Sequence, residues 1–152
     1  MLFPTFFKDI RASKIFITPE KKNYLMKEEI KMFLERAEKF KKNAKFNFDN
    51  GDYDLAMFHI EQSMQLLIKA KLLDLKGYFE RTHSLRKLLN ELRDIEGVED
   101  FLKKRKVVLR NLERAYVTSR YYFEEFFKEE VEEAFEALEE LREILWKERN
   151  TS

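Results

Sequence analysis

The chain is poor in the residues that make turns and cross-links. It contains 3 glycines, 2 prolines and no cysteine among its 152 residues. The hairpins of a multi-stranded sheet need glycine and similar turn residues repeatedly, so this scarcity favours an all-helical fold. The lack of cysteine excludes disulfides, thiolate metal ligands and cysteine nucleophiles, and it suits a reducing compartment.

Long apolar runs are also missing. No stretch approaches the about 20 apolar residues that a membrane-spanning helix requires. Charged residues interrupt the amino-terminal segment, which therefore lacks the apolar core of a signal peptide: Lys8, Asp9, Arg11 and Lys14. We therefore expect a cytoplasmic protein with no membrane partner. The abundance of lysine and glutamate and the scarcity of glutamine are typical of thermophile proteins.

Neither positive nor negative charge dominates, because the chain has 30 basic and 29 acidic residues. This balance gives no bulk surface for a polyanion, although the charges are segregated along the chain. Residues 124–143 are rich in glutamate, whereas residues 1–45 are mainly basic. We expect these faces to meet within the bundle or between subunits. A basic cluster supports nucleic-acid binding only weakly: Lys103, Lys104, Arg105, Lys106, Arg110 and Arg114.

Apolar residues recur at helical spacing in five segments, and this pattern predicts an up-and-down bundle of about five helices. The expected helices span residues 18–50, 53–75, 84–95, 99–119 and 129–147. Thr18 and Pro19 form a helix start, while Gly51, Gly77 and Gly97 mark helix ends. The bundle thus covers residues 18–149. An apolar arm, residues 1–17, precedes it and is expected to dock on the bundle or on a neighbouring subunit.

The spacing of the apolar residues predicts the inner faces of the second and fourth helices. The second helix places on one face Ala56, Ile60, Met64, Leu67, Lys71 and Leu75. The fourth places inward Phe101, Arg105, Val108, Leu112, Ala115 and Ser119, with Leu102, Leu109 and Tyr116 beside them. We expect a glycine after each of the first three helices to end it.

Three stretches, in order and spacing, resemble the HEPN family, named for higher eukaryote and prokaryote nucleotide binding. They are Ala56-Met57-Phe58-His59-Ile60-Glu61-Gln62-Ser63-Met64-Gln65 with Lys69-Ala70, then Thr82-His83-Ser84-Leu85, then Tyr116-Val117-Thr118-Ser119-Arg120-Tyr121. The resemblance covers about residues 26 to 146. It implies a helical bundle that forms a homodimer, with the fourth-helix motifs of both subunits near a shared cleft.

The resemblance also implies partners. Many such proteins pair with a minimal nucleotidyltransferase in toxin-antitoxin systems, and others bind nucleotides or serve as interaction modules. The ribonuclease branch needs an arginine followed by four to six residues and a histidine. Here no histidine follows Arg120, and neither His59 nor His83 has an arginine at that distance before it. Two further departures are Gln65, where an acidic residue is usual, and Tyr122, where proline is usual.

We therefore expect a non-catalytic HEPN-type module that needs no cofactor, regulates or binds a minimal nucleotidyltransferase, and has some affinity for ATP or GTP. One alternative is a ribonuclease-type toxin with a degenerate active site, and another is a plain dimerisation scaffold. On this interpretation the chain has no catalytic residues and is not an enzyme.

The candidate ligand-binding residues are Arg120, Tyr116, Tyr121, His83, Lys69 and Gln62. The guanidinium of Arg120 could bind a phosphate while Tyr116 or Tyr121 stacks on a base, although an arginine at a helix end also suits a structural role. The alternative for His83 is a loop hydrogen bond.

Lys69 and Gln62, seven residues apart on one helix face, could reach one ligand, but we favour a place at the border of the bundle. We expect His59 to be packed and hydrogen-bonded. No spacing predicts a metal site.

Overall fold

A computed structural model describes residues 17–121 and 124–147, without the side chains of residues 119–121. Within these residues there are six helices and no strand, which confirms the all-α fold. The helices are α2 (Pro19–Asp49), α3 (Tyr53–Lys76), α4 (Leu85–Asn90), α5 (Val98–Lys104), α6 (Lys106–Tyr121) and α7 (Lys128–Trp146). The expected arm lies outside the described residues apart from Ile17.

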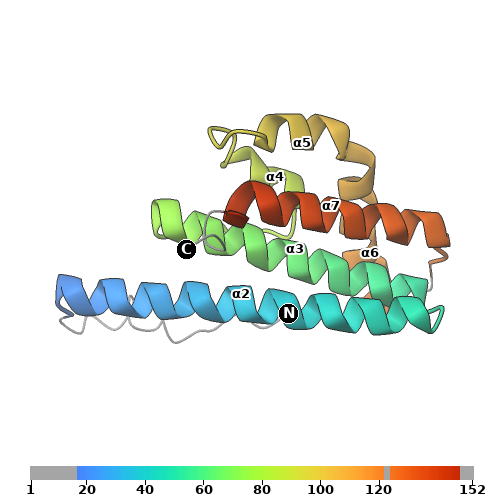
Figure 1. Ribbon diagram of the computed structural model, residues 1–152, viewed down its shortest axis with the longest axis horizontal. Helices are drawn as coiled ribbons and strands as arrows, with labels where there is room; N and C mark the ends of the chain where they lie inside the picture. The colour runs from blue at the N-terminus through green and yellow to red at the C-terminus, as the bar shows by residue number, and fades with distance from the viewer. Residues whose placement is uncertain (1–16, 122–123, 148–152) are drawn as a thin grey trace.

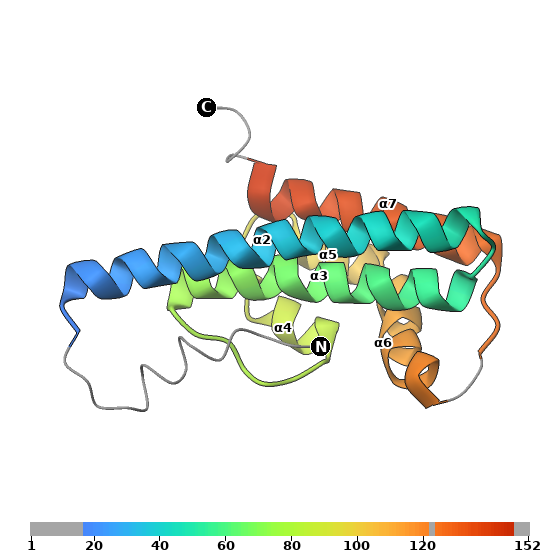
Figure 2. The same cartoon turned by 90° about the horizontal axis from the view of Figure 1, so that it is seen from below.

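Helix α3 is the centre of the bundle. Helices α2, α3 and α7 run side by side along the long axis of the molecule (Figure 1), and α2 extends beyond α3 at its amino-terminal end. Turned by 90°, the molecule shows α4 and α6 on the side of α3 that faces away from α2 and α7 (Figure 2). Helix α3 is therefore packed on several sides at once, and this position explains why so few of its side chains reach solvent.

The long hairpin of α2 and α3 begins and ends where the sequence predicts. Thr18 Oγ1 accepts a hydrogen bond from the N–H of Lys21 at 3.2 Å, and Pro19 occupies the first turn of α2. Gly77 follows α3 with φ 79°, a left-handed conformation that an L-residue adopts only with strain. The sequence also predicts that Asp52 caps the start of α3. Asp52 does hold the N-cap position, but its side chain makes no capping hydrogen bond.

The third helix is shorter than predicted, and the segment predicted as one fourth helix forms two helices, α5 and α6. Helix α4 ends at Asn90, and residues 91–97 continue in turns closed by i to i−3 hydrogen bonds such as Ile95 N to Leu92 O. A break at Arg105 divides the fourth segment into α5 and α6. Ending α5 before Arg105 places Lys103 and Lys104 at a carboxyl terminus, where positive charge is favoured.

The single inward face predicted for α3 is also wrong. Fifteen residues of α3 are buried, on every side of the helix, whereas Leu75 is 55% exposed and Lys71 is only partly buried. A helix that contacts neighbours on several sides must be apolar all round, so one stripe cannot describe it. For α7 the apolar spacing predicts one inner face, made by Val131, Ala134, Phe135, Leu138, Leu141 and Leu145. All of these side chains are buried except Phe135, which is partly buried and packs against the core.

Ion pairs join the acidic α7 to basic residues of other helices. Glu139 contacts Lys41 of α2, while Glu140 accepts from Lys104 Nζ and Arg105 Nε at 2.9 Å each. Burial alone would raise the pKa of both carboxyls, but these cations lower it below the usual value. Of these pairs, the one between Lys41 and Glu139 joins the basic residues 1–45 to the acidic residues 124–143, as predicted. None of the described helices is long and apolar enough to span a membrane.

Candidate functional site

Three aromatic rings form a column between α3, α6 and the loop before α4. The ring of Tyr116, on α6, stacks on Phe58 of α3 with centroids 6.2 Å apart and an interplanar angle of 15°. The ring of His83 stacks on Tyr116 at 4.3 Å and 29°. Tyr116 Oη also lies 3.0 Å from His83 Nε2, at hydrogen-bonding distance. Tyr116 is buried and His83 is exposed, so His83 is the solvent-facing end of the column.

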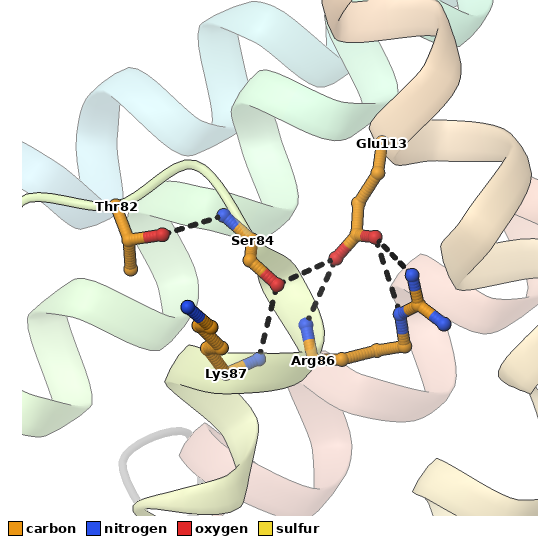
Figure 3. Close-up of polar contacts among 5 residues, drawn as sticks. All are labelled: Thr82, Ser84, Arg86, Lys87 and Glu113. Atoms are coloured by element: carbon orange, nitrogen blue, oxygen red, sulfur yellow. Dashed lines mark hydrogen bonds and ion pairs between the residues drawn. The ribbon is translucent and has the colours of Figure 1, made fainter.

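Glu113 holds the loop that carries His83. Its Oε2 accepts hydrogen bonds from Ser84 Oγ and from the main-chain N–H of Arg86, both at 3.1 Å (Figure 3). Its Oε1 accepts two more from the guanidinium of Arg86, at 3.1 Å from Nε and 2.7 Å from Nη2. The carboxylate of α6 is thus bound to the amino-terminal end of α4 by four hydrogen bonds, of which two come from one guanidinium to the same oxygen.

A row of polar side chains is buried along α3, beneath the ring column. Glu61 is fully buried and accepts hydrogen bonds from Gln62 Nε2 at 2.9 Å and from Gln65 Nε2 at 2.6 Å. Gln65 Oε1 is also buried, and it has no hydrogen-bond partner among the described residues. Burial raises the pKa of Glu61 to about 7, and the nearby charge of Glu113 adds to the increase. The two glutamine hydrogen bonds and the charge of Lys69 oppose it. Glu61 therefore changes its charge near neutral pH rather than in acid.

Lys69 is the buried cation of the same row. Its Nζ lies 5.1 Å from the ring centroid of Phe79, in a cation–π contact at the start of the loop that leads to His83. Only 1% of Lys69 is exposed. Burial lowers its pKa to about 8, and the opposing charge of Glu61 keeps the pKa from falling further. Lys69 and Glu61 thus form a buried pair of opposite charge, and burial favours the neutral form of each group.

The six predicted ligand residues meet different outcomes. The structure brings Tyr116 and His83 into direct contact, with His83 at hydrogen-bonding distance from a side chain of α6. Lys69 and Gln62 are buried at 1% each, so a place at the border of the bundle is wrong. The central position of α3 explains this burial. Arg120 and Tyr121 lie in the last turn of α6, and their side chains are outside the described part of the chain.

The prediction for His59 is confirmed. His59 Nδ1 lies 2.7 Å from Asn47 Oδ1 at the end of α2, and the ring stacks on Phe40. Burial lowers the pKa of His59, although a hydrogen bond with the Leu55 main chain opposes this. Within the described residues no group of three histidine, aspartate or glutamate side chains is placed to hold a metal ion.

Glu61 and Glu113 were not among the predicted site residues. Glu61 had a usable signal, because a polar residue within a segment that is apolar all round must lie in the core and needs partners. No nearby residue in the sequence indicates the role of Glu113. Its partners Ser84 and Arg86 are 29 and 27 residues away along the chain.

Comparisons with known proteins identify the family and the fold. The model of the HEPN domain family matches residues 30–149, which is most of the chain. Among solved structures, the crystal structure of TT1696 from Thermus thermophilus is similar, with a TM-score of 0.64 and 21% sequence identity. The similarity covers 78% of this chain and 96% of TT1696, and at this identity it shows a shared fold. A search of curated proteins found no significant match.

Proposed function

Because the chain belongs to the HEPN family, we propose that it is a non-catalytic HEPN module, a homodimer that binds and regulates a minimal nucleotidyltransferase. The observation that carries this proposal is the end of α6. Arg120 lies there, and no histidine follows it anywhere in the chain. The acid and base that would move protons in RNA cleavage are therefore missing from the position where the ribonuclease branch has them.

The surroundings of the ring column favour a phosphate-bearing ligand such as ATP or GTP. Arg120 follows Tyr116 by four residues, which is about one helical turn on α6. The exposed cations Arg81 and Lys87 lie in the same short segment as His83. Aromatic rings beside cations suit a nucleotide, whose base can stack and whose phosphates accept charged hydrogen bonds. An acidic segment of a protein partner presents the same oxygen anions.

One observation favours the ribonuclease alternative. The exposed ring of His83 contacts Tyr116, about one turn from Arg120, although His83 precedes Arg120 in the sequence. A histidine brought in from another loop could act as acid and base without the usual spacing. Its hydrogen bond with Tyr116 and its stacking hold the ring in place and support a binding role instead.

Co-purification tests the proposal. The tagged chain is expressed together with the minimal nucleotidyltransferase of its own operon, and the complex is weighed by light scattering coupled to size exclusion. We expect a complex containing two copies of this 18.6 kDa chain, and a homodimer when the chain is expressed alone. A monomer at micromolar concentration, or an operon whose products do not bind the chain, contradicts the proposal.

A further inference from the structure

The four hydrogen bonds of Glu113 join the two parts of the chain that carry the exposed ring of His83 and the buried ring of Tyr116. Ser84, which donates to Glu113 at 3.1 Å, directly follows His83. Glu113 itself precedes Tyr116 by three residues on α6, so both lie on the same side of that helix. One carboxylate therefore sets the distance between the backbone that carries His83 and the backbone that carries Tyr116.

Besides Glu113, the hydrogen bond between His83 Nε2 and Tyr116 Oη joins the loop to α6, and it does so at the rings themselves. The N–H of Thr82 donates to the Glu80 carbonyl, and the N–H of Ser84 donates to Thr82 Oγ1. Both of these are local, so they shape the loop without fixing it on α6. Glu113 instead binds the backbone beside His83, because it accepts from Ser84 Oγ and from the main-chain N–H of Arg86. The Glu113 side chain is 17% exposed and that of Arg86 is 50% exposed, so these two bonds hold the loop more firmly than the ion pair with the Arg86 guanidinium.

We propose that Glu113 is a positioning residue that holds the His83 ring over Tyr116 and so pre-forms the nucleotide-facing end of the ring column. The proposal rests on the proposed function for the identity of the ligand, but the placement of His83 can be measured without any ligand. Pre-forming the pair spares the ligand the entropy of ordering the loop when it binds. Loss of Glu113 should therefore weaken binding without removing any atom that touches the ligand.

The experiment compares the full-length protein with Glu113→Ala and with a matched control, Glu140→Ala. Glu140 is also a carboxylate that joins two helices through basic side chains, but it binds Lys104 and Arg105, outside the ring column. Two quantities are measured: the chemical shifts of the His83 ring protons by NMR, and the affinity for ATP by calorimetry. Circular dichroism shows whether each variant keeps its helices.

In the wild type, the ring current of Tyr116 should shift the His83 proton signals upfield, because the two rings stack at 4.3 Å. Glu113→Ala should return these signals toward those of a free histidine and weaken ATP binding about 2- to 10-fold, the cost of ordering one side chain. Glu140→Ala should change neither quantity. A folded Glu113→Ala protein with unmoved His83 signals overturns the proposal.

A second variant tests whether Glu113 positions His83 if Glu113→Ala does not fold. Replacing both Ser84 and Arg86 by alanine leaves Glu113 with one donor, the main-chain N–H of residue 86. His83 signals that stay at their wild-type positions in this double variant also overturn the proposal. If the wild type does not bind ATP, the proposed nucleotide affinity is wrong, while the NMR signals still decide whether Glu113 positions His83.

Discussion

The buried Glu61 should make the stability of this protein fall as the pH rises through neutrality. The pKa of Glu61 in the folded protein is about 7, against 4.5 for the unperturbed group. A raised pKa means that the folded state holds a proton that the unfolded chain releases above pH 4.5. The stability is therefore fully present below pH 4.5 and decreases as the pH rises to about 7, above which both states are ionised.

The size of this effect follows from the shift. One pKa unit corresponds to about 1.4 kcal/mol, so the full loss is about 3 kcal/mol, of which about 2 kcal/mol develops between pH 5 and pH 7.5. Glu61→Gln removes the titration while it keeps the size of the side chain and one acceptor oxygen for the neighbouring glutamines. The variant should therefore gain about 2 kcal/mol relative to the wild type over the same pH interval.

Urea denaturation at pH 5 and pH 7.5 measures this difference, with Glu139→Gln as the control. The pKa of Glu139 is lowered rather than raised, because Lys41 and Arg142 outweigh the effect of burial. Its ionised form stabilises the folded state, so the control should lose stability relative to the wild type as the pH rises from acid. A Glu61→Gln variant whose stability relative to the wild type is the same at both pH values refutes the account of the buried row.

Further predictions concern Lys69, Gly77 and Glu113. The pKa of Lys69 is lowered to about 8, so the wild type should gain about 3 kcal/mol relative to Lys69→Met between pH 8 and pH 10.5, as measured by urea denaturation. Gly77→Ala should cost about 1 kcal/mol in the same assay because φ is 79°, while the added Cβ meets Met26 at an ordinary 3.5 Å. Loss of Glu113 should release the His83 ring, as the NMR comparison above detects.

Much of the fold could be predicted because local sequence determines it. The caps at Thr18 and Gly77 and the inner face of α7 depend on residues within a few turns, and all are as predicted. The break at Arg105 could not be predicted in this way, since no glycine or proline marks it. It depends partly on Glu140, which lies 35 residues away and accepts from the Arg105 guanidinium.

The candidate site shows the same division. The motifs that carry the family resemblance pointed to His83 and Tyr116, which the fold brings together. Their relation to Glu113 depends on the packing of α4 against α6, which a single sequence does not encode as a spacing. For Gln62 and Lys69 the error came from treating α3 as amphipathic, when neighbouring helices cover it on several sides. A central helix turns its polar residues into core residues, with the pKa shifts that burial brings.

The most direct test of a non-catalytic HEPN module is an RNA cleavage assay without added metal. Structured and unstructured RNA are incubated with the wild type and with the variants Arg120→Ala and His83→Ala. A missing acid and base costs roughly 10² to 10⁴ in rate, so we expect the wild type to cleave no faster than either variant. Cleavage by the wild type that disappears in both variants would contradict the account and make His83 and Arg120 the catalytic pair of a ribonuclease.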